Sequence, residues 1–217
     1  DRNVINALNE TILPEIIQRK YKEDRRIKVW SAASSTGEEL YTLAILIEEL
    51  LKDKSGWEIE LMGSDINKEF LAKAKKGIYT KWSIRGDEFP VLNDYVTPLP
   101  NNLFEVNHLI KSRVKFFHLN LKSNNYPSQK NDLNSVDLIL CRNVLMYFDD
   151  KTKADVVNKL RKTLDKDGWI IFSPFDLNDE NKKLFITVSA EDTVVYRVSD
   201  SINNNTPIQN KNELNSI

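Results

Sequence analysis

Apolar residues recur along this chain with two periods, one typical of amphipathic helices and one typical of buried strands. Spacings of three and four residues predict helices at 4–20, 40–51, 67–76 and 152–164. Short β-branched, aromatic or apolar runs predict strands at 27–32, 57–63, 103–106, 114–119, 136–141 and 169–173, and a closing hairpin at 184–188 and 193–198. Because strands alternate with helices, the sequence predicts a doubly wound, mainly parallel α/β sheet with an antiparallel C-terminal edge.

The charge and cysteine content exclude several classes of protein. The 217 residues include 31 Lys and Arg against 32 Asp and Glu, so no overall basic field would attract nucleic acid or an anionic membrane. No run approaches the roughly 18 apolar residues of a membrane span, and no membrane insertion is expected. The single cysteine, Cys141, cannot form an internal disulfide, and two His add too few ligands for a zinc site. We therefore expect no metal and a reducing, cytoplasmic setting.

A doubly wound sheet binds its ligands at the carboxyl ends of its strands. The segments that follow strands here are 31–39, 64–65, 120–121, 142–147 and 173–176. The first has small residues, such as Ala32, and one glycine, Gly37, but neither G-x-G-x-x-G nor the Lys-Ser/Thr of a P-loop. The chain has six glycines in all, where average usage would give about fifteen. This pattern disfavours pyrophosphate binding and favours a ligand without phosphates.

Three polar side chains at these strand ends have a binding role and a structural role as alternatives. Thr36 and Glu39 match the capping box T-x-x-E, which needs no ligand, and both roles of Glu39 can hold together. Asp65 can accept the two hydroxyls of a ribose, or it can cap the helix that follows. In the first case Asp65→Ala weakens binding and changes stability by less than about 1 kcal/mol. Asn143 can bind polar groups of a ligand or form a turn.

Five blocks of sequence stand in an order that is itself informative. They are W-S-A-A-S-S-T-G-E-E-L-Y (30–41), G-S-D-I (63–66), A-K-K-G-I-Y (74–79), H-L-N-L (118–121) and D-L-I-L-C-R-N-V-L-M-Y-F-D (137–149). Together they resemble the CheR family of chemotaxis receptor methyltransferases over roughly residues 4–198. The resemblance implies a class I, Rossmann-like methyltransferase fold. It also implies a small antiparallel β-subdomain at about 100–118, which docks the receptor's C-terminal tail in some members.

The resemblance further implies a reaction and the residues that perform it. S-adenosylmethionine would donate a methyl group to glutamate side chains of a chemoreceptor or related signalling protein. Arg142 and Tyr147 would be catalytic, with Tyr147 near the transferred methyl group. Glu39 and Asp65 would hold polar groups of the cofactor, and Asn120 would lie on its adenine side. The full cofactor-binding set would be Ala32, Glu39, Asp65, Asn120, Leu121, Arg142 and Asn143. A glutamate carboxylate is already ionised near neutral pH, so no general base is needed.

The same resemblance sets the expected domain organisation. Residues 1–199 would form the S-adenosylmethionine-binding domain, and 200–217, almost without apolar residues, would be a disordered tail. The family's helical N-terminal domain and a T-x-F-F-R-like stretch would precede Asp1, so the chain is expected to lack them. Residues 82–86 resemble the version found in members fused to other signalling modules. Residues 173–176 stand where the family has a G-H-S-E-like segment.

Two other functions are kept as alternatives. The first is a non-catalytic module that binds S-adenosylmethionine or S-adenosylhomocysteine as a signal. The second is an amino-methyltransferase for nucleic acid, because S-P-F at 173–175 faintly resembles an N-P-P-Y signature. That signature belongs after the fourth strand, where C-R-N stands, and the near-neutral charge offers no track for phosphates. The sequence therefore favours the protein-glutamate methyltransferase, and it leaves the oligomeric state open.

Overall fold

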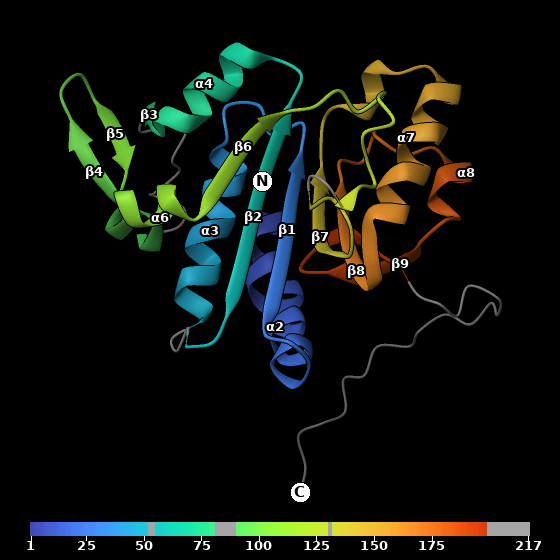
Figure 1. Cartoon of the computed structure of the whole chain (residues 1–217), viewed down its shortest axis with the longest axis horizontal. Coiled ribbons are helices and arrows are strands. Elements are labelled where there is room, and N and C mark those ends of the chain that lie inside the picture. Colours follow the sequence, from blue (N-terminus) through green and yellow to red (C-terminus); the bar gives the residue numbers. More distant parts are fainter. Residues whose placement is uncertain (52–54, 81–89, 130–131, 199–217) are drawn as a thin grey trace, which may run out of the picture.

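The computed structural model describes residues 1–51, 55–80, 90–129 and 132–198. Its centre is a seven-stranded sheet in the order β6-β2-β1-β7-β8-β10-β9 (Figure 1). The strands from β6 to β8 run parallel, and β10 runs antiparallel to β8 and β9, as the sequence predicted. The bounds are β1 (Arg26–Ala32), β2 (Glu58–Asp65), β6 (Val114–His118), β7 (Val136–Cys141), β8 (Leu164–Phe172), β9 (Ile186–Ala190) and β10 (Thr193–Arg197).

Helices cover both faces of this sheet (Figure 1). In β1, Ile27 and Val29 belong to the core under the N-terminal helices and α3, whereas Trp30 and Ala32 belong to a second core under α7. Burial of both faces explains why the carboxyl halves of β7 and β8, at 138–141 and 169–172, have apolar residues at consecutive positions. The helices are α1 (Arg2–Ala7), the π-helical η1 (Leu8–Ile12), α2 (Leu13–Lys22), α3 (Glu38–Leu50), α4 (Lys68–Lys76), α6 (His108–Ser112), α7 (Asp150–Thr163) and α8 (Asp179–Lys182).

Helix α4 begins and ends where the sequence predicts. The side chain of Asn67 accepts hydrogen bonds from the backbone N–H groups of Glu69 and Phe70, which makes Asn67 the N-cap. Gly77 ends the helix with a φ of 62°, in the left-handed region that glycine tolerates best. Local chemistry is thus sufficient to set the bounds of α4.

A second, three-stranded antiparallel sheet projects beside α3 and α6 (Figure 1). It consists of β3 (Ile78–Thr80), β5 (Leu103–Val106) and β4 (Val96–Leu99), in that order, and the 3-10 helix η2 (Pro90–Tyr95) precedes β4. The resemblance had predicted this subdomain at about 100–118. In the structure the small sheet begins earlier and ends at β5. Residues 114–118 form β6, which pairs in parallel with β2 and extends the main sheet.

Two sequence-based predictions, the tail at 200–217 and the segment 82–86, lie outside the described residues. Within the described ranges, no helix is long and apolar enough to cross a lipid bilayer.

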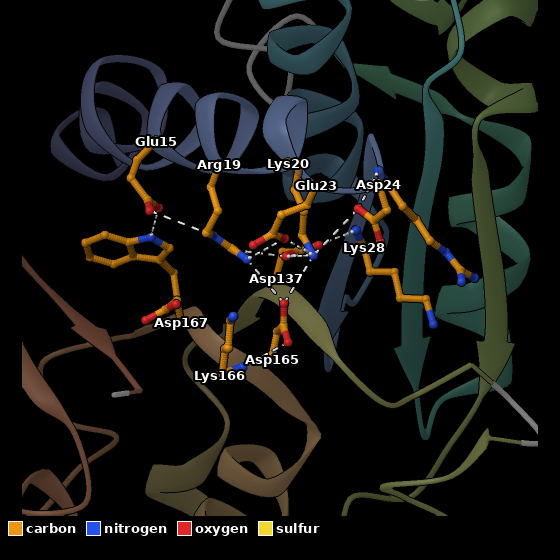
Figure 2. A network of polar contacts seen from close by, with 12 residues as sticks. Glu15, Arg19, Lys20, Glu23, Asp24, Lys28, Asp137, Asp165, Lys166 and Asp167 are labelled. Carbon is orange, nitrogen blue, oxygen red and sulfur yellow. Dashed lines mark hydrogen bonds and ion pairs between the residues drawn. The ribbon is translucent and has the colours of Figure 1, made fainter. Parts of the chain in front are cut away.

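Buried charges join α2 to the amino ends of β7 and β8. Figure 2 shows Arg19 and Lys20 reaching from the helix toward Asp137 and Asp165. Asp137 Oδ1 lies 3.0 Å from Arg19 Nη2 and 3.2 Å from Lys20 Nζ, and Lys20 Nζ lies 3.1 Å from Asp165 Oδ2. Asp137 Oδ2 also accepts a hydrogen bond from Lys28 N at 2.9 Å. This ion cluster and a polar cavity of about 450 Å³ beside it lie at the amino ends of the strands. The predicted site lies at the opposite, carboxyl ends.

Lys20 makes part of the stability of the protein dependent on pH. Burial lowers the pKa of Lys20, but Asp137 and Asp165 raise it, and the net pKa lies above the ordinary 10.5. Its contribution is therefore fully present below the unfolded-state pKa and is lost as pH rises through the folded-state pKa. We expect Lys20→Arg, which stays charged in alkali, to gain in free energy of unfolding relative to the unmodified chain above about pH 10.5. Urea unfolding across that range measures the difference; a difference that does not vary with pH would contradict the prediction.

Candidate functional site

The predicted site residues lie at the carboxyl ends of the parallel strands, which is one end of the main sheet. The parallel registers pair Ala32 with Ser64 and Asp65 with His118, so β1, β2 and β6 end at the same level. The backbone N–H of Leu119 donates to the carbonyl oxygen of Asp65 at 3.1 Å, which brings the segment after β6 against the end of β2. Asn120 and Leu121 continue from there, and Arg142 directly follows β7.

Asp65 connects two of the strand-end loops. Its side chain is buried, Oδ2 accepts from Ser35 N at 2.9 Å, and Oδ1 accepts from Asn67 N at 2.8 Å. The predicted alternative, in which Asp65 itself caps α4, is wrong because Asn67 is the N-cap. Each carboxylate oxygen can accept a second hydrogen bond. Asp65 can therefore hold the loop and still bind a hydroxyl group of a ligand.

The loop between β1 and α3 does not form the predicted capping box. The N-cap of α3 is Gly37, with a φ of 91° and no side-chain cap. The Thr36 hydroxyl donates to the carboxylate of Glu38, at 2.8 and 2.6 Å to its two oxygens. A Cβ at Gly37 would lie 2.8 Å from Phe116 Cζ, so both conformation and space favour glycine here. The carboxylate of Glu39 is thereby available for other contacts.

Arg142 links Glu39 to the first residue of the chain. Its Nη1 donates to Glu39 Oε1, and its Nη2 donates to Asp1 Oδ2, both at 2.8 Å. The sequence predicted Glu39 and Arg142 as site residues, whereas the contact with Asp1 was not predicted. Arg142 Nε and the hydroxyls of Ser31 and Ser34 are buried and, within the described part of the chain, have no hydrogen-bond partner. Unpartnered buried polar atoms at the ends of the neighbouring strands β1 and β7 fit a site for a polar ligand.

Asn120 and Leu121 are held by the loop that follows β6. Asn120 Oδ1 accepts from Lys122 N at 2.9 Å, which leaves the amide NH₂ group of Asn120 for a ligand. Leu121 is buried, and its carbonyl oxygen accepts from the Tyr126 hydroxyl at 2.7 Å and from Lys159 Nζ at 3.0 Å. This loop is therefore well anchored on the α7 side of the sheet.

The loop after β7 carries Asn143 and Tyr147. Asn143 adopts a φ of 57°, and its Oδ1 accepts from the Ser173 hydroxyl at 2.9 Å. Tyr147 ends the 3-10 helix η4 (Leu145–Tyr147), and 79% of it is exposed, so it can contact an incoming protein. A role for Asp176 was not predicted from the sequence. In the structure Asp176 lies under this loop and accepts hydrogen bonds from the loop's backbone N–H groups. The only signal was an acidic residue in the segment that departs from the family pattern.

The side chains described at this end of the sheet are mostly polar. Burial, above all, raises the pKa of Cys141, so the thiol is a small buried group and not a nucleophile. Among the residues that the structure describes, no cluster of His, Cys, Asp and Glu could hold a metal ion. The arrangement can bind and orient a polar ligand, and it offers carboxylates, amides and one guanidinium for that purpose.

A family model described as "CheR methyltransferase, SAM binding domain" matches residues 1–194. The chain belongs to the CheR methyltransferase family. The chemotaxis protein methyltransferase of Borreliella burgdorferi is 32% identical over 82% of this chain. That of Salmonella typhimurium is 34% identical over 87% of it. In both comparisons the chain spans 62% of the relative's length.

This CheR chain therefore has an S-adenosylmethionine-binding domain of the class I methyltransferase fold. The residues at the strand ends fit that cofactor. Glu39 and Asp65 carry carboxylates, which can accept hydrogen bonds from amino and hydroxyl groups, and the scarcity of glycine agrees with a ligand that carries no pyrophosphate. The two relatives are named as methyltransferases, and nothing in the comparisons supports the non-catalytic alternative.

Proposed function

We propose that this chain is the part of a chemotaxis methyltransferase that binds S-adenosylmethionine and transfers its methyl group to glutamate side chains of a chemoreceptor. The observation that carries the proposal is that Asp65 and the hydrogen-bonded pair Glu39–Arg142 all lie at the carboxyl ends of the parallel strands, inside the segment that the family model matches. The setting we propose is the cytoplasm, where the buried Cys141 stays reduced.

Different strand-end residues bind different parts of the cofactor. Bound S-adenosylmethionine supplies an electrophilic methyl group on a sulfonium. Asp65 accepts hydrogen bonds from the ribose hydroxyls, and Asn120 lies on the adenine side. Glu39 accepts from the amino group of the methionine part, and Arg142 holds the Glu39 carboxylate in place through the 2.8 Å hydrogen bond. Ala32 and the neighbouring serines leave room for the nucleoside at the end of β1.

The protein contributes alignment and not proton transfer. The acceptor glutamate is ionised near neutral pH, so it can attack the methyl group without a general base. Holding two reactants in line can supply about 7–11 kcal/mol of the barrier. Tyr147 is 79% exposed, and the role we assign to its hydroxyl is to donate a hydrogen bond to the incoming carboxylate and so to orient it.

Transfer of a labelled methyl group tests this function. The intact protein, labelled S-adenosylmethionine and a chemoreceptor cytoplasmic domain should yield receptor label that mild alkali releases, because a methyl ester is base-labile. The control is the same receptor with its acceptor glutamates replaced by alanine, which should take up no label. Label that survives alkali, or tight S-adenosylhomocysteine binding without any transfer, would contradict the proposal; the second result would favour the non-catalytic module.

A further inference from the structure

The carboxylate of Asp176 lies beneath the loop after β7. Asp176 follows β8 and is fully buried, with an exposed fraction of 0%. Its Oδ2 accepts from Asn143 N at 2.8 Å and from Ser173 N at 3.0 Å. Its Oδ1 accepts from Val144 N at 3.1 Å, from Leu145 N at 2.8 Å and from Met146 N at 3.4 Å. One side chain thus collects backbone donors from two strand-end loops.

These donors replace a cationic partner. A buried carboxylate is costly unless it is paired or fully hydrogen-bonded. Within the described ranges, no Lys or Arg forms an ion pair with Asp176, and the consecutive N–H groups of residues 143–146 point toward it instead. The conformation of the loop and the burial of Asp176 therefore depend on each other.

The loop held in this way carries two of the proposed site residues. Asn143 has a φ of 57°, in the left-handed region that asparagine adopts more readily than most residues with a side chain, and the hydrogen bond from its N–H to Asp176 helps to hold it there. The Ser173 hydroxyl donates to Asn143 Oδ1 at 2.9 Å and so leaves the amide NH₂ group as the free end. Tyr147 lies at the far end of the same loop, immediately after the N–H groups that donate hydrogen bonds to Asp176.

We propose that Asp176, supported by Ser173, is a positioning residue for methyl transfer: it fixes the 142–147 loop so that Asn143 faces the cofactor and Tyr147 faces the acceptor glutamate. This proposal rests on the proposed function for its catalytic part. Asp176 touches neither cofactor nor substrate, and it acts only through the backbone of the loop.

Asp176→Asn is the variant that tests this role. Asparagine has the same shape, but its NH₂ group would face N–H donors in place of one carboxylate oxygen. We expect the amides of residues 143–146 to exchange hydrogen at least about 10-fold faster, with the strands unchanged. We expect kcat for methyl transfer to fall about 100-fold, because small displacements at a reacting centre have effects of that size. Affinity for S-adenosylhomocysteine should fall only about 10-fold, the equivalent of one lost hydrogen bond.

Asp179→Asn is the matched control. Asp179 lies three residues further along, its side chain is 92% exposed, and it pairs with Lys182 on the surface. This variant makes the same change in charge and should leave exchange, kcat and affinity as in the unmodified protein. Asp176→Glu keeps the charge and both acceptor oxygens, so it should regain at least 10-fold in kcat over Asp176→Asn.

The readouts separate the two proposals. Unchanged exchange in Asp176→Asn, or faster exchange with unchanged kcat and affinity, would overturn the positioning role. If the unmodified protein transfers no methyl to glutamate, the proposed function fails, and exchange together with S-adenosylhomocysteine affinity still decides whether Asp176 positions Asn143. Should Asp176→Asn not fold, Ser173→Ala removes only the hydroxyl that orients Asn143. An unchanged affinity in that variant would overturn the proposal as well.

Discussion

Replacing Asp137 by alanine is expected to lower the free energy of unfolding by about 3–5 kcal/mol, the usual effect of breaking a buried ion pair from one side. The side chain of Asp137 is only 2% exposed. Its loss would leave Arg19 and Lys20, both nearly buried, with Asp165 at 3.2 and 3.1 Å and with more exposed carboxylates, such as that of Glu23, at 3.5 Å or more. It would also leave the backbone N–H of Lys28, within β1, without its acceptor. Chemical denaturation measures the change directly.

The matched control is Asp155→Ala, in the exposed part of α7. It removes the same side chain from an exposed position, and it should change stability by less than about 0.5 kcal/mol. The ion cluster lies at the opposite edge of the sheet from the proposed site, so affinity for S-adenosylhomocysteine should be unchanged in folded Asp137→Ala. Equal stability of the two variants would show that the cluster contributes nothing to the fold.

Replacing Asp65 by asparagine is expected to weaken S-adenosylhomocysteine binding about 10- to 100-fold. A hydrogen bond to a charged group contributes about 1.5–3 kcal/mol, and the ribose would lose one such acceptor. For Asp65→Ala the sequence predicted a loss of stability of less than about 1 kcal/mol, but the contacts of Asp65 in the structure imply a larger loss even for Asp65→Asn. Asp65 accepts from Ser35 N and Asn67 N, one of which asparagine would leave unpaired, so a loss of about 1–3 kcal/mol is expected. Calorimetry and thermal unfolding of the same samples measure both quantities.

Glu69→Gln is the control for that experiment. Glu69 is an exposed acid in the first turn of α4, four residues after Asp65, and the substitution makes the same change in charge. It should leave binding as in the unmodified chain. If Asp65→Asn loses stability and keeps its full affinity, Asp65 serves the loop alone and has no role in binding.

The sequence predicted most of the main sheet because its information is local. The run 136–141, apolar except for Asp137, is buried on both faces, and Asn67 and Gly77 mark the ends of α4 by their own chemistry. The small sheet was harder to locate. Its strand β3 has only three residues, and β4 contains Pro98, so neither shows a clear period.

The site residues at the strand ends were predictable for a related reason: parallel strands place their carboxyl ends together whatever the residues between them. The contacts that hold these site residues in place were not predictable from the sequence. Thr36 and Glu39 fit a capping box, but Gly37 occupies the N-cap with a positive φ. Asp176 meets its loop across about thirty residues of sequence, and Asp137 meets Arg19 across 118, so no local pattern reports either contact.

The decisive experiment is a crystal structure of this chain with S-adenosylhomocysteine. We expect the ligand at the carboxyl ends of the strands, with its ribose on Asp65, its adenine beside Asn120 and the amino group of its homocysteine part on Glu39. A nucleoside in the polar cavity at the opposite edge, against Lys20 and Asp137, would contradict it, as would the absence of any bound nucleoside at saturating concentration.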